Sequence, residues 1–79
     1  MPRIKWYHNG QPVREHNGVM MSLSPQGEAV LRLVEAFPED AGVYECKAVN
    51  RAGQITTSTT LHVESMLHKT QFIYFNQLI

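Results

Sequence analysis

Apolar and polar residues alternate with a period of two in several short stretches of this chain. Three sets of apolar residues keep one parity within such a stretch: Ile4 and Trp6; Ala29, Leu31 and Leu33; and Tyr44, Cys46 and Ala48. Because successive side chains of a β-strand point to opposite faces, this alternation predicts strands with one face toward a core. The predicted strands cover residues 3–8, 28–35 and 43–49, and a long final strand covers 54–63.

Turn-forming residues separate these stretches. Asn9-Gly10 is the pair that a type I′ hairpin turn prefers, because both of its central residues need positive φ. Pro12 then restricts Gln11–Arg14 to a short edge strand. Three further turns are predicted at Asn17-Gly18, Ser24–Gly27 and Asn50–Gly53, with a β-prone stretch over 19–24. About six short strands with regular turn signals predict an all-β sandwich or barrel.

One strand has an alternative interpretation. The segment Glu28–Ala36 contains Glu, Ala and Leu, which favour helices by intrinsic propensity. The turns on both sides and the short length favour the strand.

The chain has 79 residues, enough for one small domain. Seven basic residues balance seven acidic ones, so no net field would recruit nucleic acid or anionic lipid. The sequence holds no apolar run long enough for a membrane span. It also lacks an Asn-x-Ser/Thr acceptor for glycosylation, which favours an intracellular location over an extracellular one.

Candidate chemistry is sparse. The single cysteine, Cys46, cannot form a disulfide within this chain, and it stands in no arrangement with histidine and carboxylate that would make it a nucleophile. The four histidines lack the spacing of metal ligands: His8, His16, His62 and His68. The sequence therefore predicts no catalytic residue, no metal site and no cofactor.

The segment Asp40-Ala41-Gly42-Val43-Tyr44-Glu45-Cys46 reads D-x-G-x-Y-x-C, and Trp6 lies upstream of it. Together these residues resemble an immunoglobulin domain of the intermediate (I-set) type, and the resemblance covers residues 3–64. Residues 4–13 resemble strand C, its turn and strand C′, and 29–33 resemble strand E. Residues 37–53 resemble the E–F corner, strand F and the F–G turn, and 61–64 resemble the end of strand G.

The resemblance implies structural roles for a set of residues. Trp6 would fill the centre between the two sheets, Tyr44 would return its hydroxyl to the backbone near Asp40, and Gly53 would supply positive φ in the F–G turn. The expected structural residues are Trp6, Leu31, Leu33, Asp40, Gly42, Tyr44, Cys46 and Gly53. Asp40 of such domains tends to pair with a basic residue of strand D, but Val19–Leu23 offers no Arg or Lys.

The resemblance begins at strand C. We therefore expect residues 1–64 to form a partial I-set domain without strands A, A′ and B, in which strand E would present a bare edge and Trp6 would lack one wall. Self-association through that edge of strand E is one expected consequence.

Residues 65–79 match nothing in the family, and their final part, Gln71–Ile79, is apolar, aromatic and uncharged. One interpretation is an out-of-context end, produced by alternative splicing or by read-through into an intron, because such a window is an aggregation hazard. The other is an added strand or helix packed on the exposed core, since short apolar runs fit both forms.

Domains of this kind occur in muscle and cytoskeletal proteins such as titin, twitchin, obscurin, palladin and myosin light-chain kinase. The resemblance implies a non-catalytic module that binds protein partners, as a fragment of a cytoplasmic scaffold of the sarcomere or cytoskeleton. Two alternatives stay open at this point: a fragment of an extracellular adhesion or receptor domain, and a truncated product with no function of its own.

Overall fold

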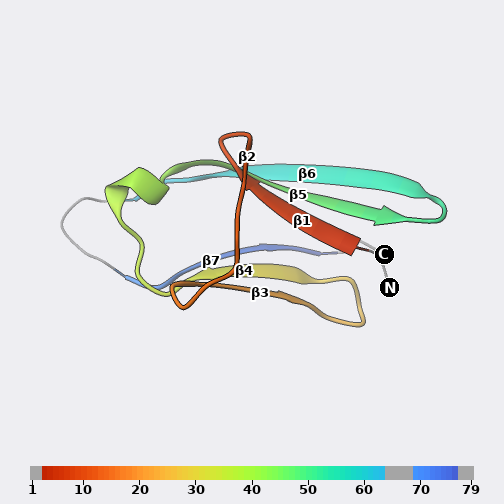
Figure 1. Ribbon diagram of the computed structural model, residues 1–79, viewed down its shortest axis with the longest axis horizontal. Helices are drawn as coiled ribbons and strands as arrows, with labels where there is room; N and C mark the ends of the chain where they lie inside the picture. Colours follow the sequence, from red (N-terminus) through yellow and green to blue (C-terminus); the bar gives the residue numbers. More distant parts are fainter. Residues whose placement is uncertain (1–2, 64–68, 77–79) are drawn as a thin grey trace.

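The computed structural model describes residues 3–63 and 69–76, which form two antiparallel β-sheets packed face to face (Figure 1). One sheet has the strand order β2 (Gln11–Pro12), β1 (Arg3–His8), β5 (Gly42–Asn50) and β6 (Gly53–Leu61). The other has the order β3 (Val19–Leu23), β4 (Ala29–Leu33) and β7 (Gln71–Phe75). A 3₁₀ turn, η1 (Pro38–Asp40), lies between β4 and β5 along the chain. The predicted all-β sandwich is confirmed.

The predicted turns connect the strands. Asn9 and Gly10 have φ values of 49° and 84°, which are those a type I′ turn requires, and β1 pairs with β2 directly across them. At the β5–β6 hairpin, Asn50 Oδ1 accepts hydrogen bonds from the backbone N–H groups of Ala52 (2.8 Å) and Gly53 (3.2 Å). Gly53 has a φ of 147°, so it supplies the positive φ that the resemblance implied.

The buried face of each main strand is the one that the alternation predicted. The core among the described residues consists of Trp6, Ala29, Leu31, Leu33, Ala36, Tyr44, Cys46, Ala48 and Ile73. Both sheets contribute to this set, which therefore fills the space between the layers. The alternative helix over 28–36 does not form, because Ala29, Leu31 and Leu33 face one core only with strand periodicity.

The β5–β6 hairpin runs past the end of the opposite sheet (Figure 1). Ile55, on the inward parity of β6, is consequently 49% exposed, whereas Leu61 at the other end of the strand is partly buried against the core. The long final strand thus has its apolar face covered at one end.

Strand β7 brings the C-terminal segment into the sandwich. It pairs with β4 in antiparallel register, with Ile73 opposite Leu31, and Ile73 is 4% exposed. The ring of Phe75 stacks on Trp6 with 5.5 Å between centroids and an interplanar angle of 23°. Of the forms considered for this segment, the structure shows an added strand over 71–75; residues 64–68 and 77–79 lie outside the described residues.

The expectation of a bare edge on the strand over 29–33 is wrong. β4 lies between β3 and β7 and pairs with both, so its backbone N–H and C=O groups are engaged on its two sides. Self-association through that edge is therefore excluded in this fold. Trp6 also gains the wall that it was expected to lack, because Phe75 covers it.

The burial of β7 predicts a sharp contrast between two neighbouring substitutions. Ile73→Ala removes a buried side chain and should lower the free energy of unfolding by about 2–5 kcal/mol. Phe72→Ala is the matched control, since Phe72 is 57% exposed, and it should cost less than about 1 kcal/mol. Urea denaturation followed by tryptophan fluorescence measures both values. Equal losses for the two variants would mean that β7 is not inserted in this register.

Candidate protein interaction surfaces

The D-x-G-x-Y-x-C segment folds into a hydrogen-bonded corner at the start of β5. The hydroxyl of Tyr44 donates to the carbonyl oxygen of Asp40 at 2.6 Å, as the resemblance implied. The carboxylate of Asp40 accepts from the backbone N–H of Phe37 at 2.8 Å, which closes the turn before it. Asp40 thus has a backbone partner, whereas the resemblance implied a basic side chain from the segment over 19–23.

His8 of β1 completes the corner from the neighbouring strand. Its ring stacks on Tyr44 with 4.4 Å between centroids and an interplanar angle of 5°. His8 Nε2 lies 2.8 Å from the carbonyl oxygen of Ala41, a contact in which the nitrogen must carry the proton and donate. The imidazole therefore has a structural role here, which sequence reasoning had not assigned to it.

Asn9 and Gly42 meet at the same corner. The backbone N–H of Asn9 donates to the carbonyl of Val43 at 2.8 Å, and the N–H of Val43 donates to Asn9 Oδ1 at 2.9 Å. A Cβ on Gly42 would lie 2.5 Å from Asn9 Oδ1, and Gly42 has a φ of 131°. The positive φ and the close approach of Asn9 both require glycine at position 42. Through its hydrogen bonds to Val43, the turn residue Asn9 links the β1–β2 hairpin to β5.

The residues singled out by the sequence fall into three groups. Trp6, Leu31, Leu33, Tyr44 and Cys46 lie in the core, Asp40 and Gly42 lie at the corner, and Gly53 lies at the β5–β6 turn. These positions maintain the fold and form no exposed cluster. A surface for partners must therefore be sought among other residues.

Cys46 is fully buried and unpaired. Burial raises the pKa of its thiol to about 11, so the nucleophilic thiolate is disfavoured at neutral pH. Burial likewise raises the pKa of Tyr44 to about 12, with the nearby Asp40 charge as the second cause.

The other described histidines, His16 and His62, are exposed. His16 accepts a hydrogen bond from the N–H of Gly18 at 3.0 Å, and His68 lies outside the described residues. Residues 3–63 and 69–76 bring together no group of three or more side chains able to ligate a metal. Within the same residues, no helix has the length and apolar character to cross a membrane.

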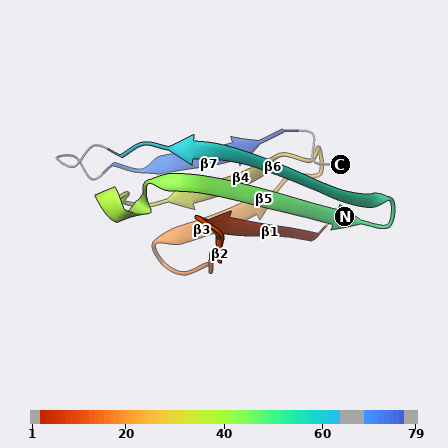
Figure 2. The same cartoon turned by 90° about the horizontal axis from the view of Figure 1, so that it is seen from above.

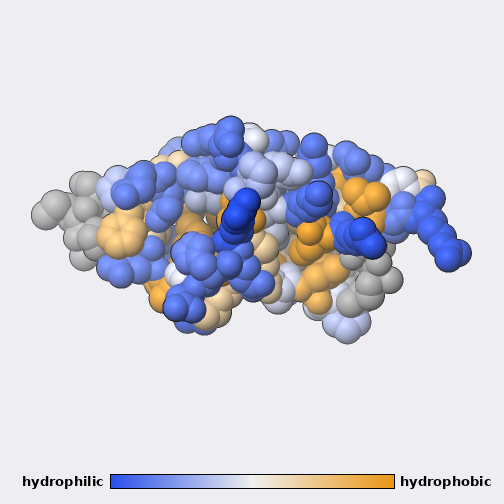
Figure 3. Space-filling view, in the orientation of Figure 1, coloured by the Kyte–Doolittle hydropathy of each residue, from blue (hydrophilic) through white to orange (hydrophobic). Residues whose placement is uncertain are grey.

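Each sheet has two outer strands, and two of these four edges are short or covered. β2 has two residues, and one of them is Pro12. The segment before β3 covers its outer edge: the N–H of Met21 donates to Glu15 Oε2 at 2.9 Å, and Val19 exchanges two backbone hydrogen bonds with His16. Figure 3 shows that mostly hydrophilic side chains lie over this side of the molecule, with hydrophobic atoms visible between the layers.

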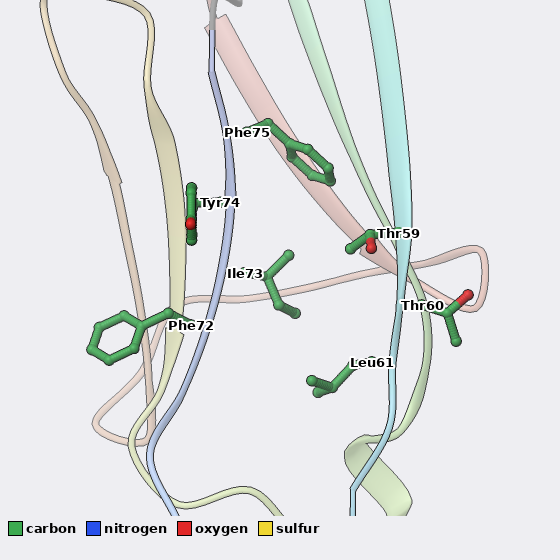
Figure 4. A pocket seen from close by; sticks show the side chains of 7 residues that line it. All are labelled: Thr59, Thr60, Leu61, Phe72, Ile73, Tyr74 and Phe75. Carbon is green, nitrogen blue, oxygen red and sulfur yellow. The ribbon is translucent and has the colours of Figure 1, made fainter.

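The other two edges, β6 and β7, border the opposite side of the sandwich (Figure 2). Neither strand contains a charged residue. An open groove between them is lined by three residues of β6 and four of β7: Thr59, Thr60, Leu61, Phe72, Ile73, Tyr74 and Phe75. In Figure 4, Leu61, Ile73 and Phe75 point into this groove, whereas Phe72 and Tyr74 point away from it to the outer face.

Comparison with known families decides the identity of this sandwich. The sequence profile of the immunoglobulin I-set domain matches residues 1–63. The chain belongs to this family. It is 40% identical over 70 residues to the muscle M-line assembly protein unc-89 of Caenorhabditis elegans and 34% identical over 64 residues to titin of Drosophila melanogaster. Those matches cover 89% and 81% of this chain.

These relatives are far longer than this I-set chain, which spans 1% of the nematode protein and, to the nearest per cent, 0% of the fly protein. Among solved structures, the titin M4 domain matches with a TM-score of 0.76 at 27% identity. That match covers 80% of this chain and 65% of the titin chain. The similarity thus extends to the arrangement of the strands as well as to the sequence.

The contact between Asn9 and Gly42 predicts unequal effects for two glycine substitutions. The methyl group that Gly10→Ala adds would have no atom within 4 Å outside the adjacent residues, but Gly10 has a φ of 84°, so the change should cost about 1–2 kcal/mol. Gly42→Ala must also displace the Asn9 side chain and break its hydrogen bond to Val43, which should cost about 1 kcal/mol more. Thermal unfolding measures the difference. A larger loss for Gly10→Ala would contradict this account of the corner.

The raised pKa values of Cys46 and Tyr44 predict alkaline destabilisation. Both groups are neutral when protonated and resist ionisation in the folded state, so their contribution to stability is complete below pH 9 and is lost as the pH rises. For Cys46 the loss falls between its ordinary pKa of 9.0 and about 11, and for Tyr44 between 10.0 and about 12. Urea midpoints between pH 8 and 10 should fall less in Cys46→Ala than in the unsubstituted chain. Identical slopes for the two proteins would refute the assignment to Cys46.

Proposed function

We propose that this chain is a non-catalytic protein-interaction module of an intracellular muscle scaffold, and that it acts as part of a longer protein of the sarcomere or cytoskeleton. The observation that carries the proposal is the 40% identity over 89% of the chain to a protein named for muscle M-line assembly. The match to titin, in sequence and in solved structures, supports the same assignment.

The described residues support binding rather than catalysis. The thiol of Cys46 is buried and held protonated, and the rings of His8 and Tyr44 are occupied with each other at the corner. These three side chains are therefore used to hold the fold. What the surface offers a partner is exposed backbone at the edges of the sheets.

The edge of β6 is the best candidate for contact with a scaffold partner. It has nine residues and lies at the end of its sheet, so it can accept an extended peptide as an added strand. Six of its residues are Gly, Ser or Thr, and none carries a charge that would repel an incoming strand. The β2 edge of the same sheet has two residues and a proline, and it offers much less.

Epitope tagging of the endogenous reading frame, followed by imaging of striated muscle, tests this function. The scaffold assignment predicts periodic labelling at one line of the sarcomere. Ser58→Lys places a charge on the free edge of β6 and should weaken that labelling, whereas Val43→Lys, on the outer face of the central strand β5, should leave it unchanged. Labelling confined to the cell surface would instead support an adhesion or receptor module.

A further inference from the structure

We propose that two copies of this chain associate through β7, by antiparallel pairing of the two strands about a two-fold axis at Ile73. This contact is separate from the partner binding proposed for β6 and does not depend on it. The occupant of the β7 edge would be the β7 strand of a second copy.

The first observation is that β7 is an edge strand that no segment within residues 3–63 and 69–76 covers. It pairs with β4 on one side and forms the end of its sheet on the other. Natural edge strands are usually shielded by a charged residue, a proline, a bulge or a covering segment. β3, at the opposite edge of this sheet, is covered by Glu15 and His16, whereas Gln71–Phe75 contains neither charge nor proline and pairs with β4 in unbroken register.

The second observation concerns charge. A two-fold contact places a strand against an identical strand, so a charged residue on the axis would meet its own copy, and charges of one sign on both sides of the axis would meet each other. Residues 71–76 are all neutral, which removes this repulsion. A charged edge strand from a different protein would find no opposite charge on β7. A second copy of β7 carries no charge, so it needs no such partner.

The third observation is the fit of the side chains. In an antiparallel register centred on Ile73, Phe72 of one copy lies opposite Tyr74 of the other, and this pair occurs twice. Phe72 and Tyr74 are 57% and 61% exposed on the outer face of the sheet, so both rings are available for cross-strand contact. On the inner face, Ile73 would meet Ile73 and extend the apolar groove across the axis.

The free β6 edge does not provide an equivalent contact. Its residues around the middle of the strand are Thr56, Thr57, Ser58 and Thr59, which offer little apolar area to bury. β7 places aromatic or aliphatic side chains at four of its five positions. The hydrophobic gain therefore favours β7 as the strand that pairs with its own copy.

Sedimentation velocity over a concentration series measures the association of the 79-residue chain. A single pair of short strands makes a small interface, so we expect a dimer with Kd of roughly 10–100 μM. In the same unsubstituted protein, hydrogen exchange of the β7 amides should slow as concentration rises, while that of the β6 amides should not. This second readout requires no variant to fold.

Two double variants test the register. Phe72→Lys/Tyr74→Lys places lysine opposite lysine across the axis, and Phe72→Glu/Tyr74→Lys places glutamate opposite lysine. Both variants lose the aromatic pairs, so a comparison of the two isolates the effect of charge across the axis. The Kd of the Lys/Lys variant should be about tenfold higher than that of the Glu/Lys variant. Ile55→Lys on β6 is the control and should dimerise like the unsubstituted chain.

Three results would overturn the proposal. The first is a chain that stays monomeric up to about 1 mM, where association would be weaker than about 4 kcal/mol. The second is an equal Kd for the two double variants when thermal melts show both to be folded. The third is loss of the dimer in Ile55→Lys, which would assign the contact to the β6 edge instead.

Discussion

The fold depends on filling the space between the sheets next to Trp6. Trp6 and Cys46 project from one sheet, and Leu31 projects from the other. A domain this small buries little apolar surface, so each core side chain contributes a large share of the total. Ile73 and Phe75 supply the remaining wall: Ile73 lies beside Leu31 on the neighbouring strand, and Phe75 stacks on the indole ring. The sandwich is thereby closed by a strand that comes after β6 in the chain, and β4 becomes a central strand with a neighbour on each side.

The second constraint is the corner that joins the two sheets. Tyr44 bonds the backbone of Asp40, His8 stacks on Tyr44 and bonds Ala41, and Asn9 bonds Val43. These contacts fix the entry of β5 against β1 and hold the 3₁₀ turn in place. Because side chains from two strands take part, the corner couples the β1–β2 hairpin to the strand that carries Tyr44 and Cys46. Residues with reactive side chains are used here to position backbone.

The covered and the open strand edges lie on opposite sides of the sandwich. One side is shielded by the Pro12 edge and by the segment over 15–16, whereas β6 and β7 leave neutral edges and an apolar groove on the other (Figure 2). Two edges of different chemistry lie side by side there: a polar, Thr-rich strand and an aromatic one. The two proposed contacts, a peptide on β6 and a second copy on β7, rest on this difference.

The sequence by itself determined the strands, their inward faces and the family. The alternation of Ala29, Leu31 and Leu33, the Asn9-Gly10 turn and the D-x-G-x-Y-x-C segment each carry local information, because period-two burial, positive φ and a short-range hydroxyl contact depend on neighbours in the chain. The position of Gln71–Phe75 was decided by tertiary structure. A short apolar run is compatible with several elements, and its partner, β4, lies about forty residues earlier. The roles of His8, Asn9 and the free edges likewise arise from packing, since they depend on which strands become neighbours, and no local pattern specifies that.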